Sequence, residues 1–208
     1  WKNRATTAWH AIAGATQPTL TPSAINGHNA IRFNKATLDR YAITDVGVGA
    51  LGSNDRSIFA MVTPRTTLDN STNIGGMIAG WPGQHSGLMV AGYPTTTSLY
   101  VSGFGTDNVM YSTNQASTGT AVMSATSTSS AGTLTQDASA NGRSPASVSW
   151  SQPAWRSFGN NLRIGAVYDS LLSYTMPLDG DIGEIIILNQ AVTATQRRQV
   201  EEYLARKW

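Results

Sequence analysis

Three glutamates are the first candidates for chemistry in this sequence, because glycoside hydrolysis needs a pair of carboxylates at a fixed separation. They are Glu184, Glu201 and Glu202. The last two fall in a predicted helix at the end of the chain. Glu184 lies within the apolar run 182–188, where a strand carboxylate satisfied by hydrogen bonds is the simpler interpretation. We therefore expect the chain not to be an enzyme.

The three histidines also lack the patterns that metal sites and hydrolases require. His10, His28 and His85 do not have metal-ligand spacing. His85 precedes Ser86, but no Gly-x-Ser-x-Gly elbow surrounds that serine. The stretch 47–52 matches G-x-G-x-x-G, yet a predicted strand rather than a helix follows it, so it does not predict a nucleotide site. The chain has no cysteine, which excludes thiolate chemistry.

Calcium is the one ion for which the sequence offers a candidate. Asp179 and Asp181 flank a glycine and form the most suggestive pair of loop carboxylates. A full calcium site takes 6–8 oxygen ligands, and nothing here resembles a complete ligand loop. Asp-Gly is also a common turn dipeptide, so ordinary turn aspartates are the alternative interpretation. We expect no cofactor, and Asp179 and Asp181 remain the calcium candidates.

Two tryptophan-containing segments fit glycan binding better. Sugars are held by an aromatic platform together with polar side chains from loops. Trp81 lies beside Gln84 and His85 in a predicted loop, and Trp150 and Trp155 lie close together before a predicted strand. Large aromatics also pack in cores and at edges, which is the competing interpretation for each of them.

The distribution of charge and the length of the apolar runs exclude two classes of function. Only 12% of residues are charged, against about 25% in a typical protein, and the net charge is +2. The basic residues are scattered, whereas nucleic-acid binding needs a clustered basic face. No apolar run reaches the ~20 residues that span a bilayer. We expect neither a nucleic-acid partner nor membrane insertion.

The residues discussed above must be positioned mainly by strands, because short runs of strand-forming residues recur between Gly, Asn and Pro. This spacing predicts an antiparallel sandwich rather than βαβ units, since the intervening stretches lack helical patterns. The runs cover residues 30–34, 57–64, 74–79, 87–93, 98–104, 121–128, 132–138, 161–167 and 181–189. The segment 112–149 is rich in Ser, Thr, Ala and Gly, and a flexible linker is the alternative there. We favour two thin, solvated strands that end in a turn at Asn141-Gly142.

One helix is predicted, at the end of the chain. The Thr193–Gln196 stretch reads as a capping box, in which the Thr193 hydroxyl and the Gln196 side chain satisfy backbone amides reciprocally. Val200, Tyr203 and Leu204 then fall on one apolar face. Glu202 and Arg206 stand four residues apart in the favourable order for an ion pair.

Three segments together resemble the concanavalin A-like lectin/glucanase superfamily, and within it the laminin-G-like jelly-roll modules of bacterial and phage surface proteins. The segment 180–208 resembles the last core strand and the terminal helix with its Tyr-Leu-x-x-Lys-Trp tail. Residues 26–33 resemble an early Asn-Gly-x-x-Ala-Leu-x-Phe strand, and residues 161–165 resemble a Leu-x-Ile-Gly strand. The resemblance implies a two-sheet jelly roll with binding loops at an edge or a concave face.

Two departures from the family pattern matter. The glucanases of this superfamily carry a Glu-x-Asp-x-x-Glu strand, which this chain lacks. The family's opening strand does not precede Trp1 in this sequence, so it is either missing or lies in an unseen part; we expect residues 1–208 to form one domain at the C-terminal part of a longer chain.

The sequence thus predicts an all-β, two-sheet antiparallel jelly-roll sandwich with one C-terminal helix. As its function we favour a non-catalytic recognition or adhesion module that binds carbohydrate or another surface ligand through loops. The alternative is a structural assembly domain of a virion, tail fibre or surface layer that contacts neighbouring subunits. A glycoside hydrolase is the weakest alternative. We expect an extracellular, cell-surface or virion location, and a homo-oligomer is compatible with either leading hypothesis.

Overall fold

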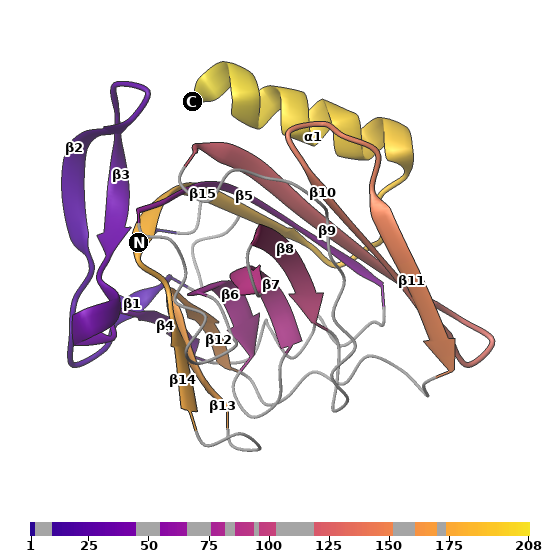
Figure 1. Cartoon of the computed structure of the whole chain (residues 1–208), viewed down its shortest axis with the longest axis horizontal. Coiled ribbons are helices and arrows are strands. Elements are labelled where there is room, and N and C mark those ends of the chain that lie inside the picture. The colour runs from indigo at the N-terminus through magenta and orange to yellow at the C-terminus, as the bar shows by residue number, and fades with distance from the viewer. Residues whose placement is uncertain are drawn as a thin grey trace.

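The protein is built from three layers: two antiparallel β-sheets that face each other and one helix outside them (Figure 1). The computed structural model describes residues 1–2, 10–44, 55–65, 76–81, 86–93, 96–102, 119–151, 161–169 and 174–208. The helix α1 (Ala194–Lys207) lies against the outer face of the larger sheet. The predicted antiparallel β-sandwich with a C-terminal helix is therefore confirmed.

Within the described ranges, the smaller sheet has six strands in the order β1-β4-β12-β6-β7-β8. Its strands are β1 (Ile12–Ala13), β4 (Tyr41–Thr44), β12 (Asn161–Ile164), β6 (Gly76–Trp81), β7 (Ser86–Tyr93) and β8 (Thr96–Ser102). Strands β6, β7 and β8 pair with their sequence neighbours. Strand β12 enters between β4 and β6, so the later half of the chain completes this sheet.

In the part of the chain that the structure describes, the larger sheet has seven strands in the order β11-β10-β9-β5-β15-β3-β2. Its strands are β11 (Ala146–Ser151), β10 (Thr133–Ala140), β9 (Ala121–Ser130), β5 (Arg56–Pro64), β15 (Gly180–Leu188), β3 (His28–Phe33) and β2 (Thr19–Ile25). The 3₁₀ turn η1 (Lys35–Thr37) follows β3, and β13 (Ala166–Asp169) pairs with β14 (Tyr174–Pro177) in a separate ribbon.

The central strand β5 is apolar on both faces because both of its faces are covered. Successive side chains of a strand point to opposite sides of the sheet. Ile58 and Val62 therefore join the core between the sheets, while Phe59 and Met61 join the smaller core under the helix. A strand buried on both sides reads as a continuous apolar run, which is why its sequence signal was clear.

The segment 112–149 contains strands, as predicted, but they are not solvated. Strands β9 and β10 lie in the interior of the larger sheet, and the first seven residues of β9 are buried. The turn at Asn141-Gly142 follows β10, as expected, and a tighter turn at Ala131-Gly132 joins β9 to β10. The prediction of thin, solvated strands was wrong. The many Ala and Ser residues do not indicate exposure here; their small side chains allow the helix to approach the sheet closely. Residues 112–118 lie outside the described residues.

The helix α1 begins with the predicted capping box. The Gln196 amide donates to the Thr193 hydroxyl, and the Thr193 amide donates to Gln196 Oε1 at 2.9 Å. Leu204 is fully buried against the sheet. Tyr203, which was predicted to share this apolar face, is 46% exposed.

A buried ion pair, which was not predicted from the sequence, holds the middle of α1 on the sheet. Arg197 Nη1 donates to Glu201 Oε1 at 2.7 Å, and both side chains are almost completely buried. Ser124 of β9 donates to the same carboxylate at 2.6 Å, and Ser139 of β10 accepts from Arg197 at 3.0 Å. These serines explain why a charged pair is tolerated there: its polar atoms are satisfied by hydrogen bonds.

The C-terminal end of α1 is tied to β15 through Glu184. This carboxylate accepts from Lys207 Nζ at 2.6 Å and from Trp208 Nε1 at 3.2 Å. The Trp208 ring covers Gly183, where a Cβ atom would lie 2.9 Å from the ring. The interpretation of Glu184 as a hydrogen-bonded structural carboxylate fits this arrangement.

One close contact fixes how the two sheets are aligned. Gly165, directly after β12, has a φ of +89°, and a Cβ atom there would overlap the ring of Phe33 from the larger sheet. Phe33 also makes an edge-to-face contact with Tyr41 of β4. These residues therefore mark one common end of both sheets, which we call the Gly165 end.

Candidate functional site

Trp81 lies at the end of the sandwich opposite Gly165. It closes β6 and pairs with Ser86, the first residue of β7. Because β12 runs antiparallel to β6, its first residue, Asn161, lies at the same end, beside Thr44 of β4. We call this the Trp81 end of the sandwich.

The larger sheet contributes Trp150 to the same end. Trp150 lies in the edge strand β11, opposite Leu134, and is one residue from the end of that strand. The first residues of β5 and β10 also lie there, because Arg56 is paired with Ser127 near the end of β9. Two of the tryptophans singled out from sequence thus belong to different sheets but to one end of the molecule.

Three of the predicted ligand-binding residues cannot be placed in the same way. Gln84 and His85 fall between Trp81 and Ser86 in the chain, and Trp155 falls between β11 and β12. All three lie outside the described residues, as does the glycine-rich stretch 47–52. Their predicted role in binding stays a prediction.

A row of polar side chains lies between the sheets at the Trp81 end. Arg56, Ser127 and Gln136 stand side by side on β5, β9 and β10, and each is at most 1% exposed. Gln136 Nε2 donates to Ser127 Oγ at 3.0 Å. Burial lowers the pKa of Arg56 to about 10. Sequence reasoning missed this row, because an arginine directly before an apolar run reads as a turn residue.

The calcium candidates lie near the Gly165 end, and both face arginines. Asp181 accepts two hydrogen bonds from Arg32, at 2.8 Å from Nε and 2.9 Å from Nη2. Asp179 Oδ1 is 3.9 Å from Arg65 Nη1. Within the described ranges no three His, Cys, Asp or Glu side chains gather as a metal site would require. The arginine contacts give both aspartates a structural role, and calcium binding stays a prediction.

A surface groove of about 360 Å³ is formed at these arginines, and we call it the Arg32 groove. Arg32 and Arg65 contribute to its lining together with Thr16, Gln17 and Thr19. The hydrogen bonds to Asp181 raise the pKa of Arg32, although burial acts in the opposite direction. The guanidinium group of Arg32 is therefore both charged and fixed in place.

The turn after β3 forms the remaining wall of the Arg32 groove. Buried Asp39 organises it: its Oδ2 accepts from the Asn34 amide at 3.0 Å, and its Oδ1 accepts from the Thr37 hydroxyl at 2.7 Å. Thr16 donates to the carbonyl of Leu38 at 3.1 Å, which joins the preceding segment to this turn. The groove walls thus come from separate chain segments held together by their own hydrogen bonds.

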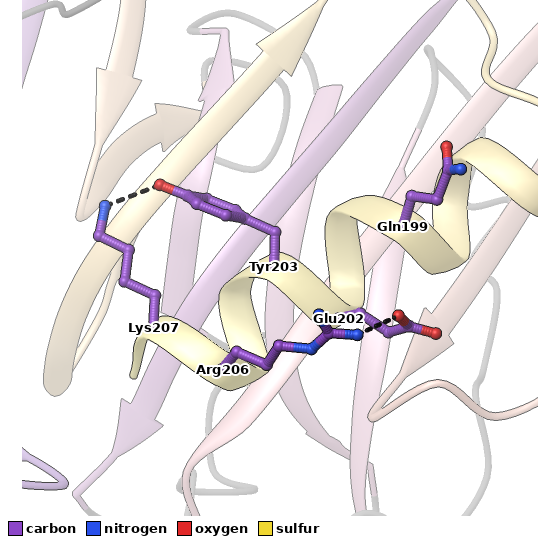
Figure 2. Close-up of a pocket in the computed structure, with 5 residues that line it drawn as sticks. All are labelled: Gln199, Glu202, Tyr203, Arg206 and Lys207. Carbon is purple, nitrogen blue, oxygen red and sulfur yellow. Dashed lines mark hydrogen bonds and ion pairs between the residues drawn. The ribbon is translucent and has the colours of Figure 1, made fainter.

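A second depression, of about 440 Å³, lies on the outer surface of α1 (Figure 2). Figure 2 shows that its lining residues all belong to this one helix, and that four of them, Glu202, Tyr203, Arg206 and Lys207, are paired with one another. Arg206 donates to Glu202 at 2.8 Å, and Lys207 donates to the Tyr203 hydroxyl at 2.9 Å. A convex helix surface with paired side chains offers a ligand little, so we do not favour it as the site.

The described part of the chain contains no helix long and apolar enough to cross a membrane. The three glutamates are all engaged in ion pairs: Glu184 with Lys207, Glu201 with Arg197, and Glu202 with Arg206.

No known protein family matches the sequence, and no curated protein sequence matches it. Solved structures share its fold. The binding domain of botulinum neurotoxin DC in complex with SialylT matches with a TM-score of 0.65 and 10% identity over 96% of this chain. The same binding domain in complex with rat synaptotagmin II matches with a TM-score of 0.63, also at 10% identity and over 96% of this chain. Both matches cover 48% of the toxin chain, so this chain spans about half the length of those structures.

A second kind of structural neighbour matches this chain over nearly the whole length of both chains. Domain 4 of AbnA, a GH43 extracellular arabinanase from Geobacillus stearothermophilus, was solved in complex with arabinotriose. It matches with a TM-score of 0.65 and 14% identity, over 95% of this chain and 91% of that one. At such low identities, these similarities establish the β-sandwich class of the chain.

Proposed function

We propose that this chain is a non-catalytic carbohydrate-binding module and that its ligand binds at the Trp81 end. The observation that carries the proposal is the strand register, which brings Trp81 and Trp150 from separate sheets to one end of the sandwich. Aromatic side chains are the usual platforms for sugar rings, and Gln84, His85 and Trp155 lie close to these two in sequence. The polar row around Arg56 gives the same end a polar interior.

The structural neighbours support this class of ligand. Two of them were solved with a bound ligand described as SialylT or arabinotriose, and a third was solved in complex with rat synaptotagmin II. The arabinanase domain supports the proposal most, because it matches this chain over nearly its whole length. A module of this kind would act outside the cell, in adhesion or recognition, as the neighbours' toxin and extracellular enzyme contexts also suggest. The laminin-G-like assignment is part of the same proposal, and rests on the sequence motifs alone.

A glycan array tests the proposal against the assembly alternative. The chain is applied to the array with and without a calcium chelator, and its size is measured in parallel by light scattering. The proposal predicts saturable binding to at least one saccharide. Binding lost on chelation would favour the calcium candidates, whereas binding that persists would count against them. A stable oligomer that binds no sugar under either condition would contradict the proposal and favour a structural assembly domain.

A further inference from the structure

We propose that the Arg32 groove is a second saccharide-binding site, separate from the Trp81 end, and that it takes a neutral sugar. The groove lies near the Gly165 end, at the start of β15 and the end of β3. The two sites are thus at opposite ends of the sandwich, and either can be disabled without touching the other.

The first argument is the supply of hydrogen-bond donors, of which those of Arg32 are fixed in place. Arg32 uses Nε and Nη2 to hold Asp181, which leaves the two hydrogens of Nη1 for another acceptor. Arg65 lies 3.9 Å from Asp179, beyond hydrogen-bond distance, so that carboxylate does not consume its donors. Side chains that are already held in place lose little entropy when a ligand binds, which favours binding.

The second argument is the local charge, which decides between a neutral and an anionic ligand. Arg32 and Arg65 contribute two positive charges, while Asp39, Asp179 and Asp181 contribute three negative ones, so the formal sum is −1. Asp39 lines the groove, whereas Asp179 and Asp181 face the two arginines without lining it, and all three aspartates are buried. A site built to attract an anion would carry a positive excess. The Arg32 groove instead offers neutralised arginine donors, which suit uncharged hydroxyl groups.

The third argument is the lining and its size. Among the described residues the groove is lined only by polar side chains, with the hydroxyls of Thr16, Thr19 and Thr37 and the amides of Gln17 and Asn34 between the arginines. The hydroxyls of Thr16 and Thr37 already donate within the protein, so they offer acceptors to the hydroxyl groups of a sugar, while the arginines offer donors. The volume of about 360 Å³ falls within the range of about 300–1,000 Å³ for small-ligand sites.

The experiment is a titration followed by amide NMR shifts. The probes are the neutral trisaccharides arabinotriose, maltotriose and cellotriose, with trigalacturonic acid as an anionic comparison, each at low and at high salt. We expect a neutral probe to shift the amides of Arg32 and Thr37, with little dependence on salt. Two groove variants should weaken this binding at least about tenfold: Gln17→Ala, which removes an exposed amide, and Thr19→Trp, which fills the groove.

The controls separate this proposal from the function proposed for the Trp81 end. Trp81→Ala should leave the groove shifts unchanged, and Arg206→Lys on the outer surface of α1 should change neither site. Circular dichroism checks that each variant is folded. If Thr19→Trp does not fold, the test rests on Gln17→Ala alone. Three results would overturn the proposal: no neutral probe shifts the groove amides, Gln17→Ala binds like the parent, or the anionic probe binds more tightly in a salt-dependent way.

Discussion

At the scale of single residues, a few buried ion pairs stabilise the fold. Ion pairs with exposed side chains contribute little to its stability. Asp181 is 2% exposed and holds Arg32 with two hydrogen bonds. Glu202 and Arg206 make an ion pair of the same length, but their side chains are 62% and 80% exposed. Exposed pairs contribute little to stability because water and salt screen them.

We therefore expect Asp181→Asn to lower the free energy of unfolding by about 1–3 kcal/mol, since it leaves a partly buried guanidinium without its carboxylate. Glu202→Gln should change it by less than about 0.5 kcal/mol. Urea denaturation of both variants measures the difference. Equal losses would show that burial does not control the contribution of these pairs.

Among the glycines that the structure describes, Gly165 is the one where an added side chain would fit worst. Its φ of +89° disfavours any side chain, and a Cβ atom would also overlap the Phe33 ring. Gly132 has a similar φ of +78°, but nothing lies within 4 Å of the position of its Cβ. Gly132→Ala should cost about 1 kcal/mol, through backbone strain alone. Gly165→Ala should cost at least about 3 kcal/mol or prevent folding. Thermal unfolding of the two variants checks this, and similar melting temperatures would argue against the close contact.

Candidate residues could be identified from the sequence, but the residues that they contact in the fold could not. Asp179 and Asp181 were recognised as a noteworthy pair, yet their contacts with Arg65 and Arg32 were not foreseen. Arg32 and Asp181 are 149 positions apart, and no local pattern reports such a distance. The Arg32 groove was missed for the same reason, because its walls come from segments that meet only in the folded sheet.

At the scale of elements, the sequence predicted correctly those features of the helix that depend on interactions between residues close together in the chain. The capping box at Thr193 and Gln196 involves residues three apart, and it was predicted from the sequence and confirmed. The face of the helix was predicted less well. Arg197 and Glu201 are buried while Tyr203 is exposed, because serines of β9 and β10 offer hydrogen bonds to the charged pair.

We expect Glu201→Ala to destabilise the protein by about 3–5 kcal/mol, because it leaves Arg197 charged, buried and without its carboxylate. Glu202→Ala, at the next position of the same helix, serves as the matched control and should have an effect of less than about 0.5 kcal/mol. Chemical denaturation followed by tryptophan fluorescence gives both values. A small effect at Glu201 would mean that the helix is not anchored through this pair.

The contact at the end of α1 makes stability depend on alkaline pH. Burial alone would lower the pKa of Lys207, but hydrogen bonds to Glu184 and Tyr203 outweigh it and raise the pKa above the ordinary 10.5. A raised pKa in the folded state means that the stabilisation is fully present below about pH 10.5 and is lost as the pH rises through the folded value. The parent should therefore be more stable than Lys207→Met at about pH 8, and the difference should shrink above about pH 11. A difference that stays constant with pH would contradict this assignment.

At the scale of the whole molecule, the sequence predicted the class of fold but not the arrangement of its strands. Apolar runs such as 57–64 and 181–189 carry the strand signal by themselves. The pairing of β12 between β4 and β6, and of β15 between β5 and β3, depends on contacts between distant segments. Only this pairing reveals that Trp81 and Trp150 share one end of the sandwich and that the Arg32 groove lies at the other.

The central claim is that a saccharide binds at the Trp81 end, and calorimetric titration of the variants tests it most directly. The ligand is the saccharide that binds best on the array, and the proteins are the parent, Trp81→Ala, Trp150→Ala and, as a control aromatic on α1, Tyr203→Ala. We predict that each tryptophan variant weakens binding at least about tenfold while remaining folded, and that the tyrosine variant binds like the parent. Unchanged affinity in both tryptophan variants would contradict the claim.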